Sequence, residues 1–193
     1  MIHVIFYFDP ICPWAWRTSL WIREAALVRP LTIEWRLFSL KAINEGHDRI
    51  PKIHALSDKP FKVLLAARQE GGNEAIDRLY RTIGEARHDQ EKDISDDEIL
   101  SENLRKAELD IALLQRALDD PNIDDELRRE HKEAAARYGA FGVPLLVIHG
   151  QQTGFFGPVI SSVPTGEDAG LLWDHVSWFL DQPWFYELKR GRK

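Results

Sequence analysis

Cysteine is nearly absent from this sequence: Cys12 is the only one among 193 residues. A single thiol cannot close a disulfide within the chain, so nothing calls for an oxidising compartment and we expect a cytoplasmic protein. Long apolar runs are also absent, and none approaches the roughly 20 residues that a membrane-spanning helix needs. The N-terminal MIHVIFYF has no basic segment and no small-residue cleavage site, so it predicts a strand rather than a signal peptide.

Positive charge is in deficit: 31 Asp and Glu residues outnumber 25 Lys and Arg residues, for a net charge of −6. Nucleic-acid-binding surfaces need clustered Lys and Arg, so this composition argues against a nucleic acid partner. Metal-ligand spacing is missing too, because no histidine pair follows H-x-x-x-H and no cysteine pair accompanies the histidines. We expect no metal site, although His54 could border a pocket. The histidines are His3, His47, His54, His88, His131, His149 and His175.

Tryptophan, by contrast, is abundant, with seven residues in the chain. Two of them, Trp14 and Trp16, follow closely after Cys12. Large aromatic side chains most often fill cores, but they also stack against flat ligands. Both interpretations stay open for this pair.

A β-α-β unit opens the chain. Residues 2–8 (IHVIFYF) are β-branched and aromatic, which is typical of a strand buried on both faces. Residues 13–28 carry an approximately helical apolar stripe, which Arg29-Pro30 ends. Residues 31–39 (LTIEWRLFS) alternate well enough to form a second strand. The two strands should be parallel, with a right-handed crossover.

Helical patterns fill the next hundred residues or so, and strand patterns then return. One predicted helix begins at Ser57-Asp58 and stops at Gly71-Gly72, and another begins at a capping box from Ser95 to Glu98. Two more cover residues 108–118 and 124–138, and Gly139 is the expected C-terminal cap of the second. The later elements are strands over 143–150 and 151–157 and a helix from Thr165 to near Pro183. The fold class is therefore α/β, with one discontinuous domain (1–39 and 139–193) and an all-helical insertion (40–138).

The stretch FDPICPWAW, residues 8–16, carries the most specific chemistry. Pro13 suits the first position of a helix, which puts Cys12 where unpaired N–H groups and the helix dipole converge. Such a position can lower the pKa of a thiol well below about 8.5, so the sequence predicts an accessible thiolate. The alternative is a buried, inert cysteine that packs as a small apolar residue.

A second feature supports a reactive thiol. Val143-Pro144 stands at the start of a later strand, where a cis-proline would lie opposite the cysteine of a thioredoxin-like site. The backbone of Val143 could then pair with an extended thiol substrate. An ordinary trans proline leading into a strand is the alternative.

Several stretches together resemble a known family: FDPICPWAW, FSLKAINEG (38–46), the GVP that includes Pro144, FFGPVISSVPTGEDAGLLWD (155–174) and FYELKR (185–190). They resemble the DsbA-like branch of the thioredoxin fold, and within it the actinobacterial mycothiol-dependent nitroreductases and their FrnE-like relatives. The resemblance implies that Cys12 is the nucleophile, that Trp14 and Asn44 line the substrate pocket, and that Pro144 is the cis-proline.

One position departs from the family pattern. Ala15 stands where dithiol members carry a resolving cysteine, while Pro13 and Trp14 between the two positions are kept. If Cys12 is active, its mixed disulfide or sulfenic acid must be resolved by an external thiol or a redoxin. The resemblance implies mycothiol, or glutathione in another setting, as a co-substrate, with no tightly bound cofactor.

The first hypothesis is therefore a monothiol oxidoreductase acting on disulfides or nitro-aromatic compounds. A second is an enzyme like the kappa-class glutathione transferases or the 2-hydroxychromene-2-carboxylate isomerases, although these usually carry serine where this chain has Cys12. A third is a redox-silent module that binds a flat ligand. We also expect that exposed aromatic residues on the insertion would permit a homodimer.

Overall fold

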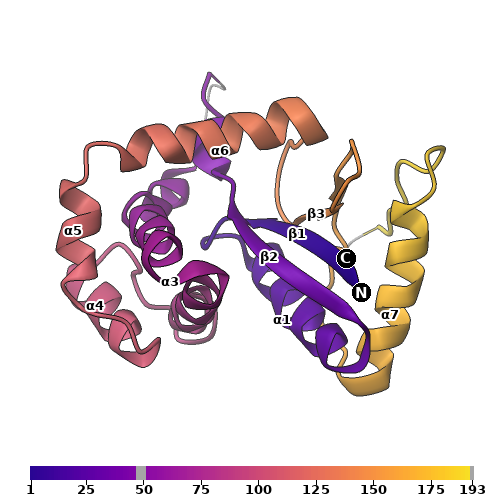
Figure 1. Cartoon of the computed structure of the whole chain (residues 1–193), viewed down its shortest axis with the longest axis horizontal. Helices are drawn as coiled ribbons and strands as arrows, with labels where there is room; N and C mark the ends of the chain where they lie inside the picture. The colour runs from indigo at the N-terminus through magenta and orange to yellow at the C-terminus, as the bar shows by residue number, and fades with distance from the viewer. Residues whose placement is uncertain (47–50, 192–193) are drawn as a thin grey trace.

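The computed structural model describes residues 1–46 and 51–191 (Figure 1). At its centre is a four-stranded mixed sheet with the order β2-β1-β3-β4. The strands are β1 (Ile2–Phe8), β2 (Leu31–Leu37), β3 (Leu145–Ile148) and β4 (Phe155–Phe156). β1 pairs in parallel with β2, as predicted, and the other two pairings are antiparallel. Within the described ranges, no helix has the length and apolar character to cross a bilayer.

Two helices that are distant in sequence lie side by side next to this sheet (Figure 1): α1 (Pro13–Val28) and α7 (Gly166–Leu180). The indole nitrogen of Trp21 in α1 donates to the carbonyl oxygen of Ala169 in α7 at 3.1 Å. Gly170 lets α7 approach the guanidinium of Arg29, because a Cβ atom there would lie 2.7 Å from the Arg29 side chain. These contacts fix α1, and with it the start of the helix that follows Cys12.

Every element described between β2 and β3 is helical, as the sequence predicts. Figure 1 shows α3, α4 and α5 gathered on one side of the sheet, while α6 passes above it on the way back to β3. The elements are α2 (Leu40–Ile43), η1 (Lys52–Ser57), α3 (Asp58–Gly84), the π-helical turn η2 (Glu85–Asp89), α4 (Asp97–Lys106), α5 (Leu113–Asp119) and α6 (Ile123–Tyr138).

Two helix boundaries differ from the prediction. The expected stop at Gly71-Gly72 is a kink inside α3, where Gly72 adopts φ 69° and ψ −161° before the chain resumes a helical course. The capping residue of α4 is Asp96 rather than Ser95, because the Asp96 carboxylate accepts the N–H groups of Glu98 and Ile99 at 2.8 and 3.1 Å. The C-terminal cap of α6 is the predicted one: Gly139 has φ 66°.

Other predicted elements are shorter than expected. Residues 108–112 precede α5 rather than belong to it, since Glu108 has φ 58° and the Asp110 carboxylate binds the N–H of Ala112 at 3.0 Å. The second strand ends at Leu37, and the two later strands keep only the residues that pair in the ladder. Alternating composition alone did not show where pairing stops.

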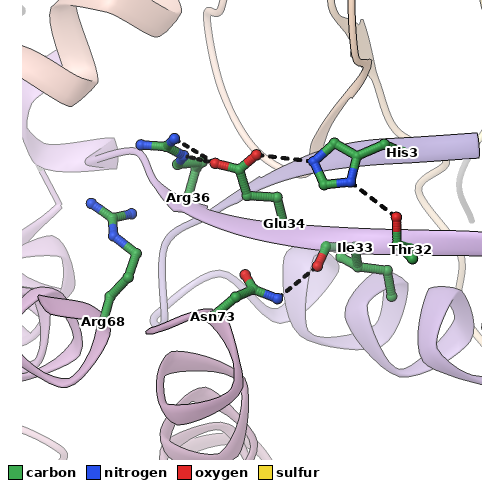
Figure 2. A pocket seen from close by; sticks show the side chains of 7 residues that line it. All are labelled: His3, Thr32, Ile33, Glu34, Arg36, Arg68 and Asn73. Atoms are coloured by element: carbon green, nitrogen blue, oxygen red, sulfur yellow. Dashed lines mark hydrogen bonds and ion pairs between the residues drawn. The ribbon is translucent and has the colours of Figure 1, made fainter. Parts of the chain in front are cut away.

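Side chains from the insertion bind the free edge of β2. Asn73 of α3 accepts the N–H of Trp35 at 2.9 Å and donates to the carbonyl of Ile33 at 2.8 Å, a contact visible in Figure 2. Glu130 of α6 accepts the N–H of Leu37 at 2.7 Å. Because these groups satisfy an edge that would otherwise be open, they dock the helical insertion to the sheet.

The core beneath α1 is shared by the sheet and the insertion. Tyr80 of α3 is fully buried, and its ring stacks on Phe8 of β1 with centroids 3.7 Å apart. The rings of Trp16 and Trp35 lie edge-on to it at 5.9 and 5.7 Å. Trp16 therefore packs in the core, and the alternative of a ligand-stacking residue does not apply to it.

Candidate active site

Cys12 caps the N-terminus of α1, as predicted. Its backbone is extended, with φ −81° and ψ 114°, and Pro13 occupies the first helical position. The Cys12 Sγ atom accepts the N–H of Ala15 at 3.4 Å. The residue that replaces a resolving cysteine thus contributes its backbone amide to the remaining thiol.

The predicted accessible, low-pKa thiolate is not what the structure shows. The Cys12 side chain is only 6% exposed. Burial is the largest influence and raises the pKa of the thiol, while the N–H groups of Ala15 and Trp14 lower it and the charge of Asp9 raises it. Desolvation of the thiol outweighs the helix terminus here, which agrees with the alternative of a buried cysteine. The free protein therefore holds Cys12 as a buried thiol.

The cis-proline prediction is confirmed. The Val143–Pro144 bond is cis, and the Cys12 thiol donates to the Val143 carbonyl oxygen at 3.6 Å. The N–H of Gly157 binds the Pro144 carbonyl at 2.9 Å, which ties this loop to the end of β4. A second cis bond, Gly157–Pro158, follows the end of β4.

Asp9 organises the loop before Cys12, a role that the sequence analysis did not predict. It is fully buried, and its carboxylate accepts three hydrogen bonds: from Ile11 N at 3.0 Å, from Leu40 N at 2.9 Å and from the Ser57 hydroxyl at 2.5 Å. Burial raises the pKa of Asp9 to about 6, against the lowering effect of those hydrogen bonds. The buried carboxyl joins the cysteine loop to the first two elements of the insertion.

The two predicted pocket residues differ in how they are held. Trp14 is half-buried, with the guanidinium carbon of Arg17 5.4 Å from its ring centroid. Asn44 is the residue that caps the C-terminus of α2, and its amide donates to the Leu40 carbonyl at 2.7 Å. In the contacts described, Asn44 does not touch Cys12. Asn44 is linked to the cysteine loop only indirectly, because the N–H of Leu40 binds the Asp9 carboxylate.

The insertion also contacts the far side of the cysteine loop, through a residue that the sequence gave no reason to select. This residue is His88, on the π-helical turn η2. Its Nε2 atom lies 2.9 Å from the carbonyl oxygen of Pro10, and its ring stacks over Trp16. A carbonyl oxygen only accepts, so Nε2 carries the proton. Burial lowers the pKa of His88. His54 lies on η1, and His47 falls outside the described residues.

The expectation of exposed aromatic residues on the insertion is wrong. The three aromatic residues between 40 and 138, namely Phe61, Tyr80 and Tyr138, are buried. Exposed aromatic side chains of the described chain lie elsewhere: Phe141, Phe156, Trp178, Trp184 and Tyr186. The structure therefore gives no support to a dimer formed through the insertion.

A hollow of about 560 Å³ lies away from the cysteine, at the junction of β2 and α3 (Figure 2). Figure 2 shows His3, Glu34 and Arg36 joined in a row, with Arg68 facing them from α3. Glu34 neutralises Arg36, and Glu130 pairs with Arg68. Both guanidinium groups that line this hollow are therefore paired with carboxylates. Across residues 1–46 and 51–191, no three His, Cys, Asp or Glu side chains are grouped so as to hold a metal ion.

Comparison with protein families finds one match over nearly the whole chain. The family model described as Rv2466c-like, mycothiol-dependent nitroreductase Rv2466c, matches residues 11–190. The uncharacterized protein Rv2286c of Mycobacterium tuberculosis is 35% identical over 194 residues, covering 100% of this chain and 83% of the relative.

Solved structures share the fold at lower identity. A probable DsbA oxidoreductase from Streptomyces coelicolor is 19% identical with a TM-score of 0.62, covering 98% of this chain and 94% of that one. The cytosolic disulfide reductase DsbM from Pseudomonas aeruginosa is 17% identical with a TM-score of 0.63, covering 91% and 98%. A 2-hydroxychromene-2-carboxylate isomerase is 15% identical with a TM-score of 0.66, covering 92% and 95%. The predicted DsbA-like thioredoxin fold is thereby confirmed.

Proposed function

Because the chain belongs to the Rv2466c-like family of mycothiol-dependent nitroreductases, we propose that it is a thiol-dependent oxidoreductase that works through Cys12 alone. One observation carries this proposal: the Cys12 sulfur sits at the start of α1 and faces the Val143 carbonyl beside the cis-proline. A thioredoxin-like site uses that backbone to align a substrate sulfur for attack by the cysteine.

The first chemical step would be disulfide exchange. The Cys12 thiolate attacks one sulfur of an oxidised small thiol or of a disulfide substrate, so that a mixed disulfide forms, the old S–S bond breaks and the other sulfur leaves as a thiolate. A dithiol enzyme would release itself with its second cysteine, but the chain has Ala15 at that position. A second molecule of small thiol, or a redoxin, must therefore attack the mixed disulfide and restore Cys12.

The small thiol that the family name indicates is mycothiol, and glutathione is the alternative. The same family name supports nitro-aromatic compounds as oxidants. Reduction of a nitro group to a nitroso group and water takes two electrons and two protons, which two thiols supply as they join in one disulfide. Trp14, half-buried beside the thiol, and Asn44 at the end of α2 are the residues we propose for the walls of the pocket.

Ionisation of Cys12 is the difficult part of this mechanism. Burial holds the thiol protonated, while the Ala15 N–H at 3.4 Å stabilises the thiolate once it forms. The thiol donates to Val143 O. A substrate that binds this carbonyl would break that hydrogen bond, so that the thiol proton is no longer held there. We propose that the thiol becomes reactive when substrate occupies the cis-proline loop.

The test is to expose the native protein to oxidised glutathione or to oxidised mycothiol and to measure its intact mass. We expect an adduct of one small thiol on the wild-type protein and none on Cys12→Ser. Reduced thiol should then remove the adduct. A Cys12→Ser variant that keeps full turnover would exclude the mechanism.

The burial of Cys12 favours one second candidate. A protonated thiol can donate a hydrogen bond to the sulfur of a bound small thiol, which would activate that thiol without forming a disulfide. This is the mode expected of an isomerase-like or transferase-like enzyme. Activity that survives in Cys12→Ser would support it, whereas a protein with neither adduct nor turnover would be a binding module.

A further inference from the structure

The buried carboxyl of Asp9 is more than a turn residue. Its two oxygen atoms bind three separate parts of the chain: Oδ1 accepts from Ile11 N in the cysteine loop and from the Ser57 hydroxyl at the end of η1, and Oδ2 accepts from Leu40 N at the start of α2. The Asp9 carbonyl additionally accepts the N–H of Cys12 at 3.0 Å. One residue thus binds the backbone of the nucleophile and the start of the helix that Asn44 caps.

We propose that Asp9 is a positioning residue of the active site: it holds the loop of Cys12 and the first helix of the insertion against each other, and it keeps a negative charge beside the thiol. This inference rests on the proposed function, because it assigns Asp9 to the pocket in which Cys12 reacts. The four-residue α2 has little stability of its own, so its position depends on tertiary contacts, of which the bond from Leu40 N to Asp9 is one.

The charges around Asp9 support a role beyond structure. Its pKa is lowered by the hydrogen bonds from Ser57, Leu40 and Ile11 but raised by burial and by the charge of Asp58. Asp58 in turn pairs with Lys41 of α2 at 2.5 Å. The buried carboxyl is therefore stabilised by neutral donors, a costly arrangement for a residue that only shapes a turn.

The charge of Asp9 affects the pKa of the Cys12 thiol and of the buried Tyr80 phenol. Burial is the largest cause that raises the pKa of Cys12 and of Tyr80, and the charge of Asp9 adds to it in both cases. Arg23 lowers the pKa of Tyr80, and Cys12 raises it. On the other side of the loop, His88 contacts Pro10 rather than the carboxyl. Removing the Asp9 charge should therefore make the Cys12 thiol easier to ionise, even though it weakens the anchor of α2.

The experiment compares Asp9→Asn with Ser57→Ala. Asparagine removes the charge and places an amide donor against Leu40 N–H, whereas Ser57→Ala removes one hydrogen bond and keeps the charge. The rate of Cys12 alkylation by iodoacetamide is measured against pH, and needs no turnover. Relative to wild type, we expect the midpoint of the alkylation profile to lie lower by about half a pH unit or more in Asp9→Asn. In Ser57→Ala we expect this midpoint to be unchanged or higher. The KM of Asp9→Asn for the small thiol should also rise at least threefold.

The outcomes separate this inference from the proposed function. A lowered midpoint without any thiol turnover supports the positioning role and contradicts the oxidoreductase. An unchanged or raised midpoint in folded Asp9→Asn overturns the positioning role, whatever the turnover. If Asp9→Asn does not fold, the wild-type protein decides: the logarithm of its alkylation rate should show a step near pH 6, where Asp9 titrates, and a straight line through that region overturns the inference.

Discussion

The Cys12 sulfur lies 3.6 Å from the carbonyl oxygen of Val143, which stands 131 positions further along the chain. A thiol can donate to this oxygen, but a thiolate cannot, so the contact favours the neutral form. Burial, the largest influence on the thiol, raises its pKa and acts in the same direction. In the mechanism proposed above, a donor group of the bound substrate would replace the thiol at this carbonyl.

The first prediction concerns the free thiol. Because burial raises the pKa of Cys12, its alkylation in the native protein should have a midpoint above the usual value of about 8.5. The measurement is the rate of iodoacetamide labelling against pH, followed by intact mass. A midpoint near 7 or below would show that the helix terminus outweighs burial.

Restoring the second thiol should change the lifetime of the mixed disulfide. In Ala15→Cys the new sulfur lies one helical turn from Cys12, whose Sγ already accepts the Ala15 N–H. Internal attack should shorten the lifetime at least tenfold without added thiol. Ala15 is fully buried, so the extra atom should cost about 1 kcal/mol of stability. Ala15→Ser matches it in size and should leave the lifetime unchanged.

Gly84 is required where α3 meets Trp16. A Cβ atom at Gly84 would lie 2.2 Å from the Trp16 ring, and both groups are buried. Gly84→Ala should therefore lower the free energy of unfolding by about 2 kcal/mol, measured with urea. Gly191→Ala adds the same methyl group with nothing within 4 Å and should leave stability unchanged. Equal stability of the two variants would show that the indole moves aside freely.

Glu130 is one of the residues that dock the insertion to the sheet. Its side chain is 6% exposed, accepts Leu37 N and pairs with Arg68. Glu130→Ala leaves the strand N–H unpaired and leaves Arg68 with only Glu126, at 4.0 Å, so it should cost about 3 kcal/mol in urea unfolding. Glu133→Ala, which removes an exposed pair with Arg137 on the same helix, is the control and should have no measurable effect. Similar losses in both variants would argue against docking through Glu130.

Asp9 should make the protein less stable as the pH rises from about 4 to about 6. Its pKa in the folded protein is about 6, above its ordinary 3.8, so the folded state binds more protons than the unfolded state in this interval. The free energy of unfolding of Asp9→Asn relative to that of wild type should therefore rise by up to roughly 3 kcal/mol between pH 4 and pH 7. Urea unfolding at several pH values checks this. A difference that stays constant would mean that Asp9 does not titrate in that range.

Local patterns predicted the fold well. The β-α-β unit, the helical block and the return to strands follow from composition and from breakers such as Pro30 and Gly139, which act within a few residues. The exact strand ends depended on partners: β4 keeps only Phe155 and Phe156, since only these pair with β3. Asp96 rather than Ser95 caps α4. The sequence could not distinguish the two, because Ser and Asp are both favoured at the N-cap and only the backbone geometry decides between them.

The geometry of the candidate site was predicted in part. Cys12, Pro13 and the cis-proline carry local signals, and the structure places Cys12 at the start of α1 and beside the cis Val143–Pro144 bond. The roles of Asp9 and His88 are not visible in sequence, because they come from Ser57, Leu40 and Pro10, which the fold brings in from distant segments. The thiol pKa was mispredicted for the same reason: a helix start is local, whereas burial is created by the whole fold.

The most direct test of the account is the intact mass of native protein after exposure to an oxidised small thiol at neutral pH, before and after reduced thiol is added. The account predicts one adduct on Cys12, its absence in Cys12→Ser, and its removal by the reduced thiol. An adduct that forms only in urea would contradict it, because Cys12 would then be a packing residue of the folded protein.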